Sequence, residues 1–437
     1  MKENIKKLLK YLPDEGKSIR GLYHNFKAKK QYLFIKIKML SQEYNIPHPD
    51  KIYWIDTDRI VFHTDYGSND EVKHNVFDMK KDKGAVYGGD WDKSDFKFTD
   101  LKAYKAIEDR IKNNVLWEDT EFYREILERI NAGETPWSCK SKKDLDEHFQ
   151  YLDELIESIK EKGYRNNKDI NTKDQAYKDN REITVNIGRD GEFLFQDGRH
   201  RLAIAKVFGI ERIPVQVLVR HKRWQEFRQK VFRIAKGKGG STKKDGYLYQ
   251  PLLHPDLQDI PAIHDCKDRF EAIKEDLPLE EGKVLDIGAN FGYFTHKFED
   301  IGFDCVAVEY NNENVEIAKK IKKAENKNFE FIHGDILDNK TISYLKNYQF
   351  DVILALNIFH HFLKEKERYD KLKILLNELN FKIMYFEPHL PDEKQMADAY
   401  KDYAEDEFVD FILSQTNLEN KKLVYQAKDG RKIFRLY

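Results

Sequence analysis

Short apolar runs alternate with longer amphipathic stretches through the second half of the chain. The runs have the length of buried strands, and the stretches between them repeat apolar residues at helical spacing. The predicted strands are 283–288, 305–309, 329–335, 350–356 and 382–388, and the predicted helices are 293–302, 312–326 and 360–379. This alternation predicts an α/β fold with a doubly wound sheet, closed by an antiparallel pair of strands at 422–426 and 432–437. Ligands of such sheets bind at the carboxyl ends of the strands.

The first half of the chain mixes strands and helices in a less regular order. An Asp-Gly turn joins the apolar runs 182–188 and 192–196, which predicts a β-hairpin. Two short runs, 51–55 and 59–63, are expected to pair as strands. A further strand and four helices are predicted at 212–219, and at 99–115, 120–131, 142–162 and 222–235. This mixture indicates an α+β domain with additional helices.

Residues 236–247 separate the two patterns. Gly, Ser and Lys dominate this stretch and no hydrophobic periodicity survives, which predicts a linker. The chain is therefore divided into an N-terminal domain, 1–235, and a C-terminal domain, 248–437. Near its start, the stretch 26–40 interleaves Lys with Phe, Leu and Ile. It predicts an amphipathic helix that covers a core or, alternatively, meets a membrane or RNA.

Composition narrows the class of protein. Charged residues make up 35% of the chain and nearly cancel to a net charge of −1, which predicts a well-solvated surface and argues against a nucleic-acid partner. The three cysteines lie far apart and form no CxxC pair, so we predict a cytoplasmic protein without a disulfide framework or a metal site. The sequence holds no run of eighteen apolar residues, so no membrane-spanning helix is expected.

A glycine-containing turn follows the strand at 283–288. "VLDIGANFGYF" places Asp286, Gly288, Asn290 and Gly292 between that strand and the next helix. Glycines at such a junction allow close approach of a ligand to the backbone, and the helix start offers free N–H groups. Glu309 ends the second strand, 23 residues after Asp286, where an acidic side chain can meet a ribose diol.

These elements, together with Asp335 at the end of the third strand, make residues 263–437 resemble a class I S-adenosylmethionine-dependent methyltransferase with a Rossmann-like sheet. The resemblance implies that Asp286, Gly288 and Gly292 hold the methionine end of S-adenosylmethionine. It implies that Glu309 holds the ribose, and that Asp335 and Ile336 hold the adenine. The sequence departs from the commoner G-x-G-x-G pattern at Asn290, a residue type that tolerates a left-handed backbone.

Polar residues follow the fourth predicted strand in "ALNIFHHF". That strand ends near Asn357, and His360 and His361 fall in the next turn, beside the expected cofactor. We predict these three residues as catalytic candidates. A hydroxyl acceptor benefits from a general base whose pKa lies near neutrality, which histidine supplies. The alternative is that one histidine caps the helix or packs against the sheet.

This turn and "YFEP", with Glu387 and Pro388, resemble the methyltransferase domain of bifunctional kinase–methyltransferases. The resemblance implies an O-antigen glycan whose terminal phosphate is methylated. A phosphate oxygen is already ionised and needs cations more than a base, so His360 and His361 would then position the acceptor.

A second glycine turn lies in the N-terminal half. "FQDGRHRLAIAKVFGI" places Asp197, Gly198, Arg199, His200 and Arg201 between a strand and a helix. Two guanidinium groups beside a helix start can hold a phosphate, and Asp197 can orient an arginine or hold a metal. The alternative is that both arginines form surface ion pairs while His200 packs.

Residues 180–235 are similar to the ParB/sulfiredoxin-like fold, whose phosphate-binding turn joins a strand to a helix in this way. Arg199 stands where sulfiredoxins have cysteine and where the chromosome-partitioning members have a key acid, so neither activity is expected. The D-G-x-H-R turn of free amino-acid kinases differs least. The resemblance implies phosphate binding and, as a possible ligand, ATP or another nucleotide.

Three functions remain open at this stage. The first is a methyltransferase that acts on a small-molecule or glycan-linked hydroxyl or phosphate, with a phosphate- or nucleotide-binding N-terminal domain. The second is a kinase–methyltransferase that phosphorylates an acceptor and then methylates it. The third is a nucleic-acid-targeted methyltransferase, which the near-zero net charge disfavours. The N-P-P-Y type of tetrapeptide found in amino-methylating nucleic-acid enzymes is also replaced here by "LNIF".

Two other clusters, "GGDWD" at 88–92 and "WED" at 117–119, combine tryptophan with carboxylates. Such groups stack on sugars or bases and can hold a metal, but they also form ordinary capped turns.

Overall fold

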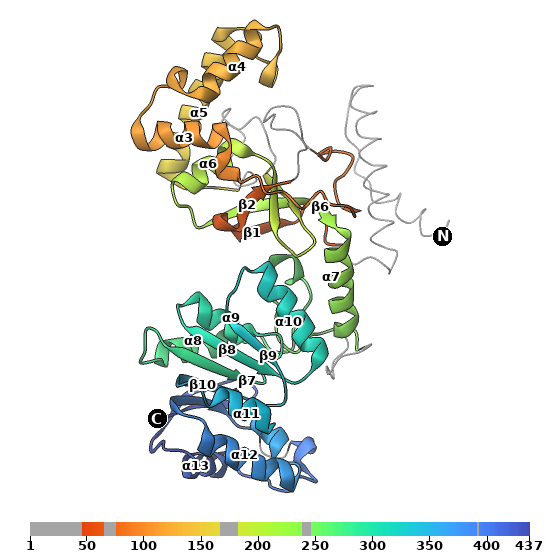
Figure 1. Cartoon of the computed structure of the whole chain (residues 1–437), viewed down its shortest axis with the longest axis vertical. Coiled ribbons are helices and arrows are strands. Elements are labelled where there is room, and N and C mark those ends of the chain that lie inside the picture. The colour runs from red at the N-terminus through yellow and green to blue at the C-terminus, as the bar shows by residue number, and fades with distance from the viewer. Residues whose placement is uncertain (1–45, 65–75, 167–181, 238–245, 391–392) are drawn as a thin grey trace, which may run out of the picture. The chain divides into compact units, whose positions relative to one another are not determined.

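The computed structural model describes residues 46–64, 76–166, 182–237, 246–390 and 393–437 (Figure 1). The chain divides into one compact unit of residues 1–48 and a second of residues 49–437. The amphipathic stretch 26–40 and residues 238–245 of the predicted linker lie outside the described residues. The elements below all belong to the second unit.

The first sheet, as far as the residues are described, has six strands in the order β1-β6-β4-β5-β2, with β3 also paired to β6. The predicted hairpin is confirmed, because β4 and β5 pair antiparallel around the Asp-Gly turn. The strands are β1 (Ile52–Asp56), β2 (Ile60–His63), β3 (Ala85–Tyr87), β4 (Ile183–Ile187), β5 (Phe193–Asp197) and β6 (Arg212–His221).

The predicted pairing of β1 with β2 is wrong. β1 pairs antiparallel with β6, whereas β2 pairs parallel with β5. A 3-10 turn, η1 (Thr57–Arg59), redirects the chain between them. The N–H of Thr57 donates to the carbonyl of Glu211 at 2.9 Å, which fixes this turn beside the start of β6. In the sequence, a connection of three residues between two apolar runs is typical of a hairpin. The pairing of β1 with β2 was predicted for this reason.

Helices α3 to α7 accompany this sheet where helical spacing predicted them. Thr120 and Ser141 cap α4 and α5 by accepting hydrogen bonds from the N–H groups of Tyr123 and Asp144. The helices are α3 (Lys102–Asn113), α4 (Glu121–Asn131), α5 (Lys142–Lys162), α6 (Arg199–Val207) and α7 (Lys222–Ala235).

The second sheet, within the described residues, has seven strands in the order β12-β13-β11-β10-β7-β8-β9. Strands β7 to β11 run parallel, and β13 runs antiparallel to both β11 and β12, which confirms the predicted α/β class with its closing pair. The strands are β7 (Lys283–Ile287), β8 (Asp304–Glu309), β9 (Glu330–His333), β10 (Phe350–Leu356), β11 (Phe381–Glu387), β12 (Lys421–Gln426) and β13 (Lys432–Leu436).

Helices cover both faces of this sheet (Figure 1). Side chains alternate along a strand, so Val284 of β7 packs with one set of helices and Leu285 with the other. Three of these helices, α8, α11 and α13, were not predicted from the sequence. The first set is α8 (Lys267–Asp276), α9 (Tyr293–Asp300) and α10 (Asn312–Ala324), and the second is α11 (Asn339–Leu345), α12 (Lys366–Glu378) and α13 (Glu405–Ser414).

The residues after the predicted linker belong to the first hydrophobic core. Leu248, Leu252, Leu257 and Ile260 are buried there together with the strands of the first sheet. The first core also includes Phe291 of the turn after β7 and Ile317 and Ile321 of α10, so residues on both sides of the predicted linker contribute to it.

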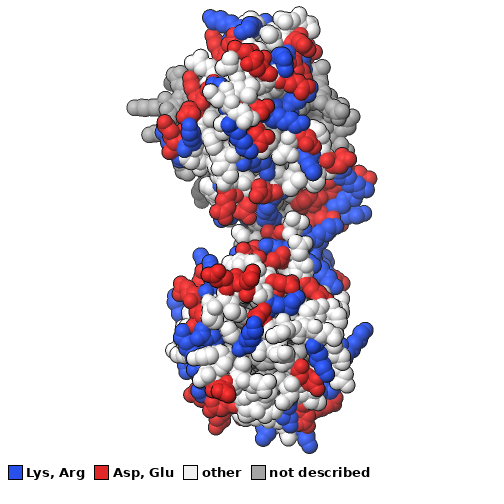
Figure 2. Space-filling model, turned by 60° about the vertical axis from the view of Figure 1, so that its left-hand side comes forward, with Lys and Arg blue, Asp and Glu red and all other residues white. Residues whose placement is uncertain are grey.

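Acidic and basic side chains are interspersed over the face of the molecule seen in Figure 2. Across the described ranges, no helix is long and apolar enough to cross a membrane.

Candidate active site

The order of the second sheet reverses between β7 and β10, because β8 lies on one side of β7 and β10 on the other. Connections leave these two strands in opposite directions, so a crevice opens at their carboxyl ends. This is the point at which open α/β sheets bind their ligands. The residues that follow β7, β8 and β10 are those that sequence analysis singled out.

The turn after β7 needs its glycines. Gly288 has a φ of 71°, and a Cβ there would lie 2.7 Å from Cδ1 of Ile358. Gly292 has a φ of 80° and caps the start of α9. Asn290, which replaces the expected middle glycine, has a φ of 55°, so its backbone is left-handed as that position requires.

Asp286 sits at the bottom of this crevice. Its side chain is buried and accepts a hydrogen bond of 2.6 Å from Oγ1 of Thr295 on α9. Burial raises the pKa of the Asp286 carboxyl to about 6, and the nearby charge of Glu309 acts in the same direction. Burial makes the ionised form of this carboxyl unfavourable. A ligand that brings a hydrogen-bond donor or a positive charge to it would therefore be bound favourably.

Glu309 ties the ends of two strands together. One carboxylate oxygen accepts from the N–H of Asn290 at 2.9 Å, and the other accepts from the N–H of Asn311 at 2.8 Å. The first bond joins the glycine turn after β7 to the end of β8. Oδ1 of Asn290 is buried and has no hydrogen-bond partner among the described residues. The predicted pair Asp286 and Glu309 thus lies at one edge of the sheet, with the polar turn between them.

Asp335 lies beyond β9 and is engaged by an arginine. Its carboxylate accepts two hydrogen bonds from the Arg368 guanidinium, at 2.8 Å and 3.3 Å. Burial alone would raise the pKa of Asp335, but Arg368 and the N–H of Leu337 hold that pKa below its ordinary value. Ile336, beside it, is buried in the core under this edge.

Asn357 follows β10 with a left-handed backbone, at a φ of 54°. Its Nδ2 donates to the hydroxyl of Tyr249 at 3.1 Å, and its Oδ1 accepts from Nη1 of Arg431 at 2.9 Å. The guanidinium of Arg431 also pairs with Glu393 at 3.0 Å. The sequence pattern predicted Asn357 but not its partners, which come from segments more than seventy residues away in the chain.

The two histidines lie in the 3-10 turn η6 (Phe359–Phe362), and they differ in exposure. His361 is exposed, whereas His360 is buried. Burial, together with His361 and His389 nearby, lowers the pKa of His360 to about 2. The expectation of a base titrating near neutrality is therefore wrong for His360.

The contact with Gln395 determines which nitrogen of the His360 ring carries the proton. Nε2 of Gln395 lies 3.2 Å from Nε2 of His360. An amide nitrogen only donates, so the ring accepts at Nε2 and carries its proton on Nδ1. That Nδ1 is buried and has no hydrogen-bond partner in the described part of the chain. His360 is thus equipped to donate a hydrogen bond to a ligand.

Glu387 of the "YFEP" motif ends β11 and also forms an ion pair with an arginine. Nε of Arg269, on α8, donates to its carboxylate at 2.9 Å, and both side chains are buried. Burial raises the pKa of Glu387, which the charge of Arg269 only partly offsets. Pro388 follows the strand directly.

The N-terminal glycine turn has the predicted strand–turn–helix form. Gly198 has a φ of 95° at the start of α6, and a Cβ there would lie 3.2 Å from the backbone of Ile183. Oδ1 of Asp197 accepts from the N–H of Gly198. Nη1 of Arg199 is buried and has no hydrogen-bond partner among the residues that the structure describes, and a carboxylate oxygen of Glu182 lies 4.0 Å from Arg201.

His200 points elsewhere. Its ring centroid lies 5.6 Å from that of Trp137 and 5.7 Å from that of His148, on the helical side of the domain. Burial lowers the pKa of His200 well below its ordinary value. These surroundings are those of a packed core side chain, so the anion site considered below rests on the arginines.

The two tryptophan–carboxylate clusters stabilise the fold. Asp92 is buried and accepts from the backbone N–H and the guanidinium of Arg189, which ties the loop 88–92 to the β4–β5 hairpin. Trp117 is buried in the first core and donates to Asp153 at 3.1 Å. Among the described residues, no group of three or more His, Cys, Asp or Glu side chains is placed to hold a metal ion.

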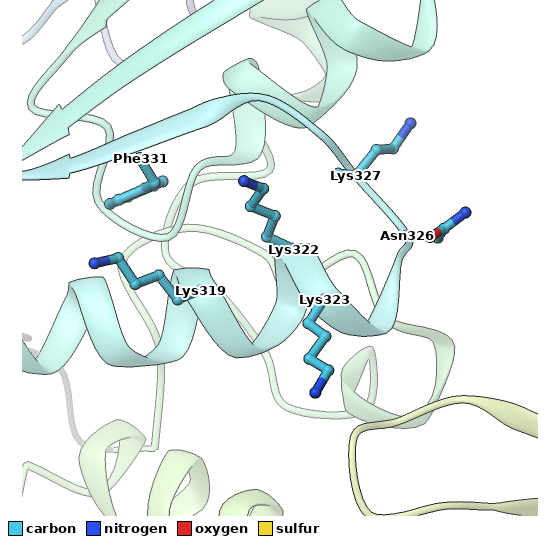
Figure 3. A pocket seen from close by; sticks show the side chains of 6 residues that line it. All are labelled: Lys319, Lys322, Lys323, Asn326, Lys327 and Phe331. Atoms are coloured by element: carbon cyan, nitrogen blue, oxygen red, sulfur yellow. The ribbon is translucent and has the colours of Figure 1, made fainter.

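A lysine-rich pocket of about 420 Å³ lies beside α10 and β9 (Figure 3). Lys323 and Lys327 point away from Phe331, and each is paired with an aspartate. Basic side chains also accumulate naturally near the C-terminal end of a helix, where the dipole favours them. Lys323 and Lys327 therefore do not converge with Lys319 and Lys322 on one ligand. The lining residues are Lys319, Lys322, Lys323, Asn326, Lys327 and Phe331.

Comparison with known proteins agrees with the geometry of the second sheet. Residues 284–378 match the family model of a methyltransferase domain. The O-antigen chain terminator bifunctional methyltransferase/kinase WbdD of Escherichia coli is 30% identical over 141 residues, which cover 30% of this chain and 19% of WbdD. An uncharacterized methyltransferase of Staphylococcus carnosus is 29% identical over 140 residues, covering 32% of this chain and 62% of that protein.

A solved structure of WbdD covers 44% of this chain and 43% of its own, with 20% identity and a TM-score of 0.37. A Pyrococcus horikoshii protein covers 40% of this chain and 91% of its own, with 19% identity and a TM-score of 0.29. This chain thus spans about a fifth of the curated WbdD relative and less than two thirds of the staphylococcal one. The similarity is therefore to a methyltransferase domain, and the matching family model covers residues 284–378 of this chain.

Proposed function

We propose that this chain transfers the methyl group of S-adenosylmethionine to a small-molecule or glycan-linked acceptor, at a hydroxyl or phosphate oxygen. The hydrogen bond from Asn290 to Glu309 carries the proposal, because it brings the glycine turn and the acidic end of β8 to one point of the crevice. The two motifs end neighbouring parallel strands, and the crevice at that end of the sheet is where folds of this class bind a ligand.

The residues at this edge fit the cofactor. Oδ1 of Asn290 is a buried acceptor without a partner in the described residues, and Gly288, packed against Ile358, keeps the left-handed turn that a side chain would disturb. Asp286, Gly288 and Gly292 would hold the methionine end and Glu309 the ribose, with Asp335 and Ile336 at the adenine. When bound, S-adenosylmethionine supplies an electrophilic methyl group.

The acceptor would lie on the side of Asn357 and η6. The Nδ1 proton of His360 is positioned as a hydrogen-bond donor, so it can orient an acceptor oxygen without removing a proton. His361 is exposed beside it. Because WbdD is named as a methyltransferase and kinase of O-antigen chains, a glycan acceptor is the first class to examine.

Titration calorimetry of the full chain with S-adenosylmethionine tests the cofactor assignment. Glu309→Gln should weaken binding at least tenfold, because the carboxylate is the acceptor for both backbone N–H groups and for the ribose. Glu313→Gln, on the first turn of α10, is the matched control and should bind as the native chain does. Equal affinities in all three proteins would contradict the assignment.

The acceptor is identified by a gain of 14 mass units. Glycans, sugar phosphates and small hydroxyl compounds would be incubated with the protein and S-adenosylmethionine and then examined by mass spectrometry. A methylated product that Glu309→Gln fails to form would identify the acceptor class. Methylation of a nucleic acid alone would overturn the proposal for this site.

The α6 turn supports a second activity, the binding of a phosphate or nucleotide such as ATP. The specific observation is Nη1 of Arg199, a buried guanidinium nitrogen to which no described residue is hydrogen-bonded, next to the left-handed Gly198 at a helix start. Its charge also contributes to the lowered pKa of the buried His63 ring, to about 3, although burial contributes more. An anion would complete the hydrogen bonding of Arg199.

Thermal-shift measurements on the full chain with ATP, CTP, GTP and sugar phosphates test this site. The native chain should be stabilised by at least one of them, and Arg199→Ala should lose the shift. Arg233→Ala, exposed on α7, is the control and should keep it. Stabilisation by ATP, followed by transfer of its labelled γ-phosphate to an acceptor, would establish a kinase. No shift with any compound would leave Arg199 a structural residue.

A further inference from the structure

The segment from Tyr247 to His264 connects the two cores, and one of its residues reaches the methyltransferase site. Leu248 and Leu252 are buried in the first core, whereas the hydroxyl of Tyr249, between them, accepts from Asn357 at the end of β10. The ring of Tyr249 packs edge-on against His264, with centroids 4.8 Å apart. Burial raises the pKa of this hydroxyl, so it stays protonated.

The first core holds this segment through a buried aspartate. The carboxylate of Asp256 accepts from Arg220 at 2.7 Å, from Trp224 at 3.0 Å and from the hydroxyl of Tyr53 at 3.0 Å. Burial alone would raise the pKa of Asp256. The positive charges of Arg220 and, to a smaller extent, Arg228 hold that pKa well below its ordinary value. A charge satisfied by this many donors fixes the segment, and therefore Tyr249, in one place.

Asn357 is the link between Tyr249 and the rest of the site. Its side-chain amide donates to Tyr249 and accepts from Arg431, so both of its ends are fixed. Arg431 continues through Glu393 to Gln395, which contacts His360. The chain of bonds begins on the segment held by the first core and ends on the predicted acceptor side of the sheet.

We propose that Tyr249 is a positioning residue of the methyltransferase site, supplied by a segment that the first core holds. The backbone of Asn357 lies in the left-handed region, which asparagine tolerates better than most residues, and contacts at both ends of its amide hold the side chain in place. The Tyr249 hydroxyl accepts from Asn357, and no described residue accepts its proton, so that proton is available to a bound ligand. The site is therefore complete only when both cores are folded. This inference rests on the function proposed above.

A double-mutant cycle measured by titration calorimetry with S-adenosylhomocysteine tests the proposal on the full chain. Tyr249→Phe should weaken binding about three- to tenfold, as expected for one buried hydrogen bond. Asn357→Gly keeps the left-handed backbone and removes the amide, and it should weaken binding at least as much. The double variant should bind as Asn357→Gly alone, because the two residues act through one bond. Thermal unfolding midpoints, measured in parallel, separate this effect from loss of fold.

The control is Tyr344→Phe, on α11, whose hydroxyl contacts Glu330 at the opposite, amino-terminal end of the strands. It should bind as the native chain does. If the native chain binds and Tyr249→Phe binds within twofold of it, this inference is overturned while the proposed function stands. Additive losses in the double variant would also overturn it. If the native chain fails to bind at all, the proposed function falls and the inference falls with it.

Discussion

Replacing Asp286 by Asn should stabilise the ligand-free protein at neutral pH while removing cofactor binding. The carboxyl is buried, its pKa is raised to about 6 by that burial, and the ordinary value is 3.8. A carboxyl whose folded pKa lies above its unfolded pKa stabilises the fold most below the unfolded value. That stability is lost as the pH rises through the folded value.

The magnitude follows from the two pKa values. A difference of about two units corresponds to about 3 kcal/mol, which the ligand-free protein loses on going from below pH 4 to pH 8. The amide introduced by Asp286→Asn would still accept the hydrogen bond from Thr295, but its N–H groups need acceptors, which costs about 1 kcal/mol. Asp286→Asn should therefore gain about 2 kcal/mol at pH 8. At pH 5 this gain should be smaller by about 1 to 1.5 kcal/mol, because the native carboxyl is then mostly protonated.

The assay must report on the second sheet alone, because a chain with more than one core need not unfold in one step. All five tryptophans lie between residues 54 and 224, outside the second sheet, so their fluorescence does not report directly on that sheet. Cys305 is a free, buried thiol on β8. Its reaction with 2,2′-dithiodipyridine, which labels thiols at both pH 5 and pH 8, would be followed over a urea series by peptide mass spectrometry.

Asp351→Asn is the control of opposite sign. The Asp351 carboxylate pairs with Lys382 and accepts from the N–H of Lys283, which together lower its pKa. Its stabilising contribution is present above the unfolded pKa, so its loss should destabilise the same sheet at pH 8. If Asp286→Asn changes the protection of Cys305 equally at pH 5 and pH 8, the reasoning from a buried carboxylate is refuted.

Three other outcomes follow from single contacts. His360→Asn should lower the methylation rate but leave the shape of the pH–rate profile between pH 6 and 7 unchanged, because the pKa of His360 is already about 2; parallel pH–rate profiles of the two proteins check this. Gly288→Ala should lower the unfolding temperature and remove S-adenosylmethionine binding, because the new Cβ would lie 2.7 Å from Ile358; calorimetry measures both. Arg189→Ala should cost about 3 kcal/mol, because it leaves the buried Asp92 without its charge partner, and urea unfolding followed by tryptophan fluorescence measures the loss.

The parts of the site that lie within one strand–turn–helix unit were predictable from the sequence. Asp286, Gly288 and Gly292 are separated by two to four residues, and their conformations follow from the turn that joins β7 to α9. Glu309 was predictable because it ends the next strand, and parallel strands align their carboxyl ends at one edge. Local backbone chemistry decides these positions, so a sequence pattern is sufficient.

The partners of Asn357 were not predictable, because they depend on where distant segments pack. Tyr249 lies 108 residues earlier in the chain and Arg431 lies 74 residues later. Nothing in the stretch around Tyr249 distinguishes it from any other tyrosine near a linker. The one available signal was the Asp-Gly turn at 429–430, which orients the residue after it, but that turn also occurs in ordinary hairpins.

Burial was the other quantity that the sequence did not reveal. His360 and His361 are adjacent and identical in type, yet one is buried and the other exposed. Desolvation disfavours the charged imidazolium, and this lowers the pKa of His360 out of the range in which a histidine serves as a base at neutral pH. In the same way, His200 reads as part of a basic triplet but packs against aromatic rings.

The charges on the acceptor side indicate how a hydroxyl and a phosphate acceptor can be told apart. Arg431 is paired with Glu393, and Arg269 with Glu387, so a phosphate would have to compete with carboxylates for either guanidinium. Because His360 donates a hydrogen bond and does not act as a base, the oxygen of the methyl acceptor must lose its proton to solvent. A phosphate monoester completes its ionisation near pH 6, so its methylation rate should level off above pH 7. A hydroxyl stays protonated far above that range, so its rate should still rise between pH 7 and pH 9. The pH–rate profile therefore identifies the acceptor oxygen, and a bell-shaped profile centred near neutrality would contradict the donor role of His360.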